Sequence, residues 1–233
     1  MGTPKKPDAR LLSAVPYLRH GASVVDVGTD HAYLPVFLLR EGLATRALAC
    51  DVNAGPLARA RKNIAEAGLS ERIGTLLTDG LHGVEPFAPD HVLVFGMGGE
   101  LIVRILSEAD WIRRPGIRLI LQPMTRAQVL RGWLWENGFG TVGERLTAAD
   151  GRVYQTICAE WTGRPTPFTP VDALVGKPEF LAADPLCPVF LEREIRTRKK
   201  ILRGKATGNR TDPTEEDLLR ALEERLRGIG ENA

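Results

Sequence analysis

Short apolar runs alternate with amphipathic segments over the first two thirds of the chain. Most of the segments between these runs carry apolar residues at helical spacing. Valine- or leucine-rich runs bounded by glycine or polar residues are typical of buried strands, and they lie at 23–28, 46–51, 72–79, 91–96 and 116–122. Strand–helix alternation on this scale predicts a parallel sheet with helices on both faces and right-handed crossovers.

The pattern changes after residue 138. Two strand-like runs within 139–161 flank Asp150-Gly151, a dipeptide typical of hairpin turns. A doubly wound sheet that ends in an antiparallel hairpin is the usual layout of class I methyltransferases, whereas dinucleotide-binding domains normally lack the hairpin. The predicted fold class is therefore α/β, with a Rossmann-like methyltransferase sheet and a terminal antiparallel hairpin.

A proline-rich stretch, "TGRPTPFTP" (162–170), separates this sheet from the C-terminal region. Beyond it, two apolar stripes at helical spacing predict two antiparallel helices joined by "GKATGNRTDP". We therefore expect a first domain over residues 1–162, and a linker with a small α-helical hairpin over residues 163–233.

Composition says little about the fold, but it limits the cellular compartments in which the protein could work. The net charge is +2, and no apolar run approaches the roughly 18 residues that a membrane span needs. The N-terminal "MGTPKKPDAR" has no apolar region after its lysines, and the three cysteines form no Cys-x-x-Cys pair. We expect a cytoplasmic protein with free thiols and no membrane association.

Ligands of open α/β sheets bind beyond the carboxyl ends of the strands, so the residues there are the candidate site. The first predicted strand ends in a loop that has one glycine where phosphate-binding loops have several. A pyrophosphate in this loop would meet like charge, which favours a cationic ligand such as a sulfonium. The candidates at these ends are Asp26, Gly28, Asp30, His31 and Tyr33, then Asp51, Val52 and Asn53, then Asp79 and Gly80, and finally Gly96, Met97, Gly98 and Gly99.

Three of these candidates have two interpretations each. Asp51 lies where nucleoside-binding folds hold the ribose diol, and the alternative is that it caps the following helix. The glycines of 96–99 would admit a ligand close to the backbone, or form a tight turn. His31 could act in catalysis or serve as a structural hydrogen bonder, and its spacing to the other histidines indicates no metal site.

Five segments together resemble the bacterial tRNA (adenine-N1)-methyltransferase family that acts at tRNA position 22. They are "VVDVGTDHAYLP", "DVNAGPLARARKNIAEAGL", "TDGL", "FGMGGELI" and "RLILQP", and the resemblance covers roughly residues 10–161. It implies the cofactor S-adenosyl-L-methionine, the product S-adenosyl-L-homocysteine, and a C-terminal helical module that helps to hold tRNA. Met124 departs from the family pattern, in which we expect an asparagine after Gln-Pro.

The resemblance also assigns the candidate residues by motif. Asp26, Gly28, Asp30 and His31 match the first cofactor loop, 51–53 the ribose end, 79–80 the adenine end, and 96–99 the segment that faces the methyl group. Adenine N1 already has a lone pair, so the enzyme mainly has to align it with the methyl group. We expect Asp30 and His31 to be catalytic, because a carboxylate would stabilise the cationic product.

N1 lies on the Watson–Crick edge, so the base must be exposed or flipped, and Tyr33 is a candidate to contact it. The basic run on the first C-terminal helix is a candidate tRNA phosphate site, or else a solvated face whose charges pair with acids of the second helix. We expect tRNA as the partner of a monomeric chain. The basic candidates are Arg193, Arg196, Lys199, Lys200 and Arg203.

Two other functions stay open from the sequence. A nicotinamide-dependent oxidoreductase could use a similar sheet, although the terminal hairpin and the missing glycines argue against it. A non-catalytic RNA-binding module would keep the fold and bind tRNA without transferring a methyl group.

Overall fold

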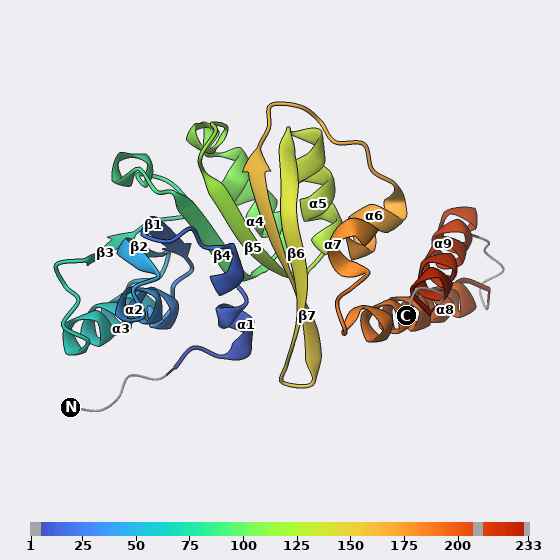
Figure 1. Ribbon diagram of the computed structural model, residues 1–233, viewed down its shortest axis with the longest axis horizontal. Helices are drawn as coiled ribbons and strands as arrows, with labels where there is room; N and C mark the ends of the chain where they lie inside the picture. Colours follow the sequence, from blue (N-terminus) through green and yellow to red (C-terminus); the bar gives the residue numbers. More distant parts are fainter. Residues whose placement is uncertain (1–5, 207–211, 231–233) are drawn as a thin grey trace.

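The computed structural model describes residues 6–206 and 212–230. Its centre is a seven-stranded sheet in the order β3-β2-β1-β4-β5-β7-β6 (Figure 1). The first five strands are parallel, and β7 runs antiparallel to both β5 and β6. The strands are β1 Ala22–Val27, β2 Ala44–Asp51, β3 Ile73–Leu77, β4 His91–Gly98, β5 Arg118–Thr125, β6 Phe139–Ala149 and β7 Arg152–Trp161.

Helices cover both faces of the sheet, because successive residues of its central strands point to opposite sides. Val25 and Val27 of β1 belong to one core cluster, with α4 and α5, whereas Val24 belongs to another, with α2 and α3. The helices are α1 Ala9–Leu12, α2 Tyr33–Arg40, α3 Ala54–Glu66, α4 Gly99–Ser107, α5 Ala127–Glu136, α6 Pro170–Val175, α7 Pro178–Leu181, α8 Cys187–Ala206 and α9 Pro213–Gly230, with single 3-10 turns at Val15–Tyr17, Glu85–Phe87 and Asp110–Ile112.

The predicted fold class is confirmed, with differences at the strand ends. The hairpin turns at Asp150 and Gly151, whose φ angles of 48° and 69° suit a type I′ turn. Strands β4 and β5 continue to Gly98 and Thr125, beyond the predicted ends, because these two residues still pair across an irregular register. The prediction missed α1, α6 and α7, which are too short for periodicity to reveal.

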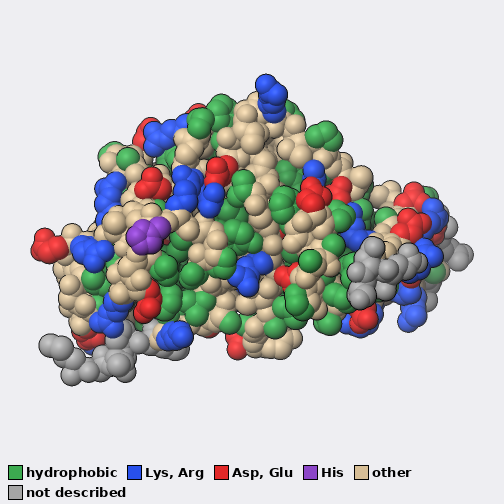
Figure 2. Space-filling model, in the orientation of Figure 1, with side chains coloured by type: hydrophobic (Ala, Val, Ile, Leu, Met, Phe, Trp, Pro, Cys, Tyr) green, Lys and Arg blue, Asp and Glu red, His purple; other side chains and the backbone are tan. Residues whose placement is uncertain are grey.

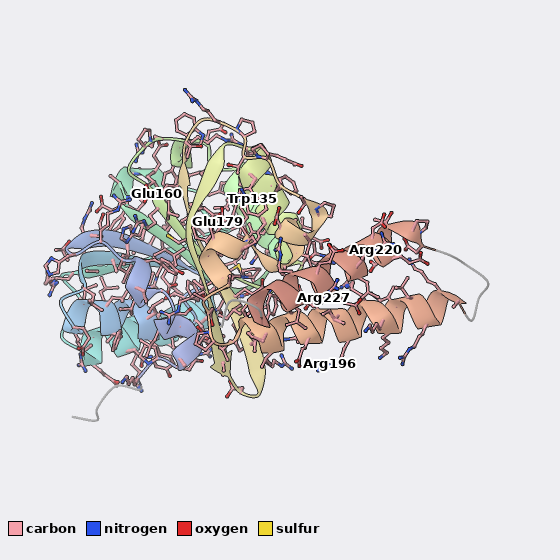
Figure 3. The ribbon with its side chains drawn as sticks, turned by 45° about the vertical axis from the view of Figure 1, so that its right-hand side comes forward. Trp135, Glu160, Glu179, Arg196, Arg220 and Arg227 are labelled. Atoms are coloured by element: carbon pink, nitrogen blue, oxygen red, sulfur yellow. The ribbon has the colours of Figure 1, made fainter. Side chains whose placement is uncertain are left out.

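The predicted helical hairpin is present as α8 and α9, which lie side by side at one end of the molecule (Figures 1 and 3). Part of the connection between them, residues 207–211, is outside the described residues. A third core cluster joins these helices to α6 and α7, and it includes Leu146 from the β6–β7 hairpin. The helical module is therefore packed directly on the sheet.

Two arginines fix this module to the sheet. The side chain of Arg131 on α5 is fully buried, donates to Glu144 of β6 at 2.6 Å, and donates to the carbonyl oxygens of Ala173 and Leu174 at 3.1 and 3.2 Å. Arg225 of α9 donates to the Asp172 carboxylate at 2.7 Å. Because 172–174 all belong to α6, this helix links the sheet to the α8–α9 hairpin.

Candidate cofactor and substrate site

The loop after β1 has a strained but well-held backbone. Gly28, Asp30 and Ala32 have φ angles of 74°, 51° and 56°. Such angles cost a non-glycine residue of order 1–3 kcal/mol, so the surroundings must impose them. The N–H groups of Gly28 and Thr29 both donate to the Cys50 carbonyl at 2.9 Å, and α3 donates to the His31 carbonyl through the Asn63 amide, also at 2.9 Å.

Asp51 ends β2 and interacts with the loop rather than capping α3. One carboxylate oxygen accepts from the Asn53 N–H at 2.8 Å, and the other lies 3.3 Å from the Asp30 N–H. The residue at the N-cap of α3 is Asn53, so the helix-cap interpretation of Asp51 does not hold. A carboxylate has about four acceptor positions, so Asp51 keeps capacity for a ligand diol.

An apolar edge lies beside Asp51. Val52 is 61% exposed, and Leu77, which pairs with Asp51 across β2 and β3, is 53% exposed. Large exposed aliphatic side chains at a strand end offer a surface on which the face of a purine can lie.

Asp79, the other candidate for the adenine end, is already paired. Both terminal nitrogens of the Arg104 guanidinium donate to its carboxylate, at 2.8 and 3.2 Å, and this ion pair lowers the pKa of Asp79.

Asp26 is buried under the same loop. Its carboxylate accepts from the Thr29 hydroxyl at 2.7 Å. Burial raises the pKa of Asp26 to about 6, the Thr29 bond opposes that rise, and the nearby charge of Asp51 adds to it. A cation in the cleft above Asp26 would therefore stabilise its charged form.

The four residues of the segment 96–99 have different surroundings. Gly96 has a φ of 76° and lines the cleft, whereas the Met97 side chain covers Gly28 so closely that a Cβ at residue 28 would clash with it. Gly99 is buried at the first turn of α4, where a Cβ would overlap the carbonyl oxygen of Arg126. Close packing of α4 on β5 thus requires Gly99, while Gly96 faces the candidate site.

A cavity of about 420 Å³ lies at the carboxyl edge of β1 and β4. Inside it the structure brings together many of the predicted residues, whereas 51–53 and 79–80 lie further along the same edge. The rings of His31 and Tyr33 stack with 5.1 Å between centroids, and the His31 Nε2 lies 3.5 Å from the Asp30 carboxylate. The lining includes Asp26, Gly28, Asp30, His31, Tyr33 and Gly96.

One wall of this cavity is not predicted by the sequence pattern. It consists of the N-terminal segment 6–11, including Lys6, Asp8 and Arg10. Arg10 is joined to Gln122 at the end of β5, a contact between residues 112 positions apart. No local sequence signal identifies such a pair.

The basic residues of α8 have mixed surroundings. Lys199 lies 2.7 Å from Glu223 of α9, as the pairing interpretation predicted, whereas Arg196 lies 3.5 Å from Glu192 of its own helix. Within 6–206 and 212–230, the side chains of Arg193 and Lys200 make no ion pair or hydrogen bond. Figure 2 shows acidic and basic side chains interspersed over this end, and Figure 3 shows Arg196 on α8 with Arg220 and Arg227 on α9.

A groove of about 420 Å³ connects α8 with the carboxyl end of β5. Arg193 lines it from α8, Arg152 from the start of β7, and Met124 and Arg126 from the end of β5. Met124, the departure from the expected asparagine, is 38% exposed there. The groove thus gives α8 a cationic face directed toward the ligand-binding edge of the sheet.

The part of the chain that the structure describes contains neither a membrane-spanning helix nor a cluster of metal ligands. None of its helices is both long enough and apolar enough to cross a membrane. It also holds no group of three or more His, Cys, Asp or Glu side chains placed to bind a metal ion.

Comparison with known proteins identifies the family. The profile of a family described as "Methyltransferase domain" matches residues 8–157. The tRNA (adenine(22)-N(1))-methyltransferase of Bacillus subtilis (strain 168) is 31% identical over 167 residues, which cover 72% of this chain and 70% of that protein.

Solved structures extend the match over almost the whole chain. The B. subtilis M1A22 tRNA methyltransferase TrmK superposes with a TM-score of 0.79 at 28% identity, covering 97% of this chain and 98% of the other. Streptococcus pneumoniae Sp1610 in complex with S-adenosyl-L-methionine gives 0.81 at 31% identity, covering 94% and 99%. M. capricolum TrmK with S-adenosyl-homocysteine gives 0.76 at 27% identity, covering 98% of each chain. The chain therefore belongs to the bacterial tRNA (adenine-N1)-methyltransferase family that acts at position 22.

Proposed function

We propose that this chain transfers the methyl group of S-adenosyl-L-methionine to N1 of adenine 22 in tRNA, at the carboxyl edge of β1, β2 and β4. The observation that carries the proposal is the pair of carboxylates at the loop after β1, Asp30 in the lining of the cleft and Asp26 buried beneath it, in a loop with a single glycine. Negative charge there suits a sulfonium and disfavours a pyrophosphate. Relatives of similar length bind the same cofactor and its demethylated product.

The residues along this edge fit the parts of the cofactor. When bound, it supplies a methyl group on a positively charged sulfur. Asp51 would accept both ribose hydroxyls, and Val52 and Leu77 would flank the adenine ring. Asp79 is paired with Arg104, so it would contact the adenine end of the cofactor only if this ion pair were shared with the ligand or broken. We therefore assign Asp79 a smaller contribution to cofactor binding than Asp51.

The target base would bind on the side of the cleft formed by His31 and Tyr33, away from the residues that flank the cofactor's adenine. The stacked rings of His31 and Tyr33 present an aromatic face, and base–aromatic stacking contributes about 1–3 kcal/mol per base. The carboxylate of Asp30, whose side chain is 63% exposed, can offset the positive charge that N1-methylation leaves on the base. The two ligands would approach each other over Gly96 at the end of β4, whose φ of 76° favours glycine.

The helical module would hold the tRNA body. In this proposal residues 1–162 bind the cofactor, and 163–233 supply a cationic surface on α8, of which Arg193 faces the groove to β5. Of the five basic candidates, Arg193 and Lys200 contribute most, because pairing with Glu192 and Glu223 reduces the charge that Arg196 and Lys199 offer. The chain acts as a monomer in the cytoplasm.

The direct test is incubation with radiolabelled cofactor and unmodified tRNA, followed by mapping of the methylated nucleoside. We expect 1-methyladenosine at position 22, and none in a matched tRNA with guanine at that position. Asp30→Ala and His31→Ala should lower kcat more than cofactor affinity. Binding of tRNA without methyl transfer would instead support the non-catalytic alternative.

A further inference from the structure

The groove between α8 and the end of β5 carries an excess of positive charge. Its lining comes mainly from three places in the fold: the turn from β5 into α5, the start of β7 and the first half of α8. Among the described residues, the charged side chains of this lining are one glutamate, Glu194, and four arginines. The arginines are Arg126, Arg152, Arg193 and Arg198.

Two of the four arginines already have acidic neighbours. Arg198 lies 3.2 Å from Glu215 of α9 and 3.8 Å from Glu194, so the one acid of the groove is placed against it. Arg126 lies 3.8 Å from Glu100. The side chains of that second pair are 62% and 66% exposed, so it neutralises Arg126 only weakly.

Arg152 and Arg193 are the unpaired cations of the groove. Within 6–206 and 212–230, neither side chain makes a hydrogen bond or an ion pair, and both residues are exposed. They come from different parts of the chain, because Arg152 belongs to the sheet and Arg193 to the helical module. An anion in the groove would therefore meet one free guanidinium from each part.

The first turn of α5 adds to the positive potential of the same groove. Arg126 is its N-cap residue and provides no side-chain cap, and both Ala127 and Gln128 line the groove. The first N–H groups of a helix have no partner within the helix, so they favour negative charge nearby. Together with the two unpaired arginines, they make an anion the expected ligand.

The groove lies directly beside the candidate methyl-transfer site. Thr125, which lines the groove, pairs with Gly98 of β4, and Gly96 of the same strand lines the cleft. Neighbouring strands are about 5 Å apart, so the groove begins one strand away from the cleft. Its volume of about 420 Å³ is within the range of roughly 300–1,000 Å³ typical of ligand pockets.

We propose that Arg152 and Arg193 together bind one phosphodiester of the tRNA strand that carries the target adenine. This inference rests on the proposed function, because it takes tRNA as the substrate. The planar fork of an arginine matches two phosphate oxygens, and two such forks hold one phosphate from both sides. The contact places the strand against the sheet as well as against the helical module. A carboxylate of a partner protein is the competing ligand, and the position of the groove beside the cleft favours RNA.

The test is binding of the full chain to tRNA in which the phosphates around nucleotide 22 are replaced one at a time by uncharged methylphosphonates. One replacement should weaken binding to the wild-type protein by roughly 10- to 100-fold, as expected for hydrogen bonds between charged groups. The double variant Arg152→Met/Arg193→Met should bind unmodified tRNA that much more weakly, and the same replacement should then have no further effect.

Arg227→Met is the matched control. Arg227 of α9 is also exposed and, within the described residues, unpaired, but it does not line the groove (Figure 3). This variant should keep the full response to the methylphosphonate. The double variant should keep its circular dichroism spectrum and its affinity for S-adenosyl-L-homocysteine, because neither arginine lines the cleft.

Other outcomes overturn the inference. Absence of any sensitive phosphate in the wild-type protein would do so even if the double variant failed to fold. A sensitive phosphate that stays sensitive in the double variant would place the contact elsewhere, and two phosphates that each depend on one arginine would exclude a shared site. Weaker binding of S-adenosyl-L-homocysteine by the double variant would assign the arginines a structural role. If the wild-type protein neither binds nor methylates unmodified tRNA, the proposed function itself fails.

Discussion

The buried ion pair between Arg131 and Glu144 should be one of the most sensitive points of the structure. Their side chains are 0% and 1% exposed, with 2.6 Å between Nη2 and the carboxylate. Removing one partner of such a pair leaves an uncompensated buried charge, at a cost of about 3–5 kcal/mol. Arg131→Met and Glu144→Leu should therefore each destabilise the protein by that amount, a large part of the 5–15 kcal/mol typical of a whole domain.

The double variant should be less damaged than the sum of the two single variants. Removing both charges eliminates the desolvation penalty, but it still leaves the carbonyls of Ala173 and Leu174 and the side-chain oxygen of Gln155 without their arginine donor. Buried unsatisfied acceptors cost about 1–3 kcal/mol each unless water reaches them. We expect the double variant to lose about 2–5 kcal/mol, well below the 6–10 kcal/mol of simple addition.

Urea unfolding followed by circular dichroism measures these free energies. Arg220→Met is the matched control, because its ion pair with Asp217 is 68% and 72% exposed and should contribute below about 1 kcal/mol. Since Arg131 also holds α6, each single variant should weaken tRNA binding more than cofactor binding. Single variants that cost under about 1 kcal/mol, or a double variant that equals their sum, would refute the argument from burial.

Three further predictions concern the site. Asp51→Ala should weaken S-adenosyl-L-homocysteine binding by roughly 10- to 100-fold in calorimetry, since it removes hydrogen bonds to a charged acceptor; unchanged affinity would remove Asp51 from the site. Burial raises the pKa of Asp26 from 3.8 to about 6, so its favourable contribution to folding is complete below pH 3.8 and lost as the pH rises through 6. Asp26→Asn should therefore gain up to about 3 kcal/mol over wild type between pH 4 and pH 8 in urea unfolding, whereas a difference independent of pH would contradict the assignment. Replacing Arg193 and Lys200 together with alanine should reduce the slope of log tRNA affinity against log salt by up to about two, and an unchanged slope would mean that α8 is only a solvated face.

Local sequence patterns were sufficient to predict the strands of the sheet. Short apolar runs and the Asp150-Gly151 turn predicted all seven strands, because burial and turn geometry act on neighbouring residues. The rule that ligands bind at the carboxyl ends of parallel strands then placed the candidate edge. Family motifs in the first loop and in residues 96–99 added the cofactor and the reaction.

Contacts between distant residues were beyond the reach of those patterns. Arg10 lines the cleft and is held there by Gln122, 112 positions later, and Gly99 is needed because the Arg126 carbonyl packs against it. The charge of α8 likewise depends on which acids of α9 lie opposite, as Lys199 and Glu223 show.

The sequence by itself thus determined the succession of the seven strands and of the longer helices, the candidate ligand-binding edge and the class of reaction, since periodicity, turn residues and motifs are properties of short segments. Only the tertiary structure decided which side chains meet at that edge. Asp51 interacts with the loop after β1 instead of capping α3, Asp79 is held by Arg104, and an N-terminal arginine enters the cleft. Those outcomes depend on how separate elements pack, and packing is a property of the whole chain.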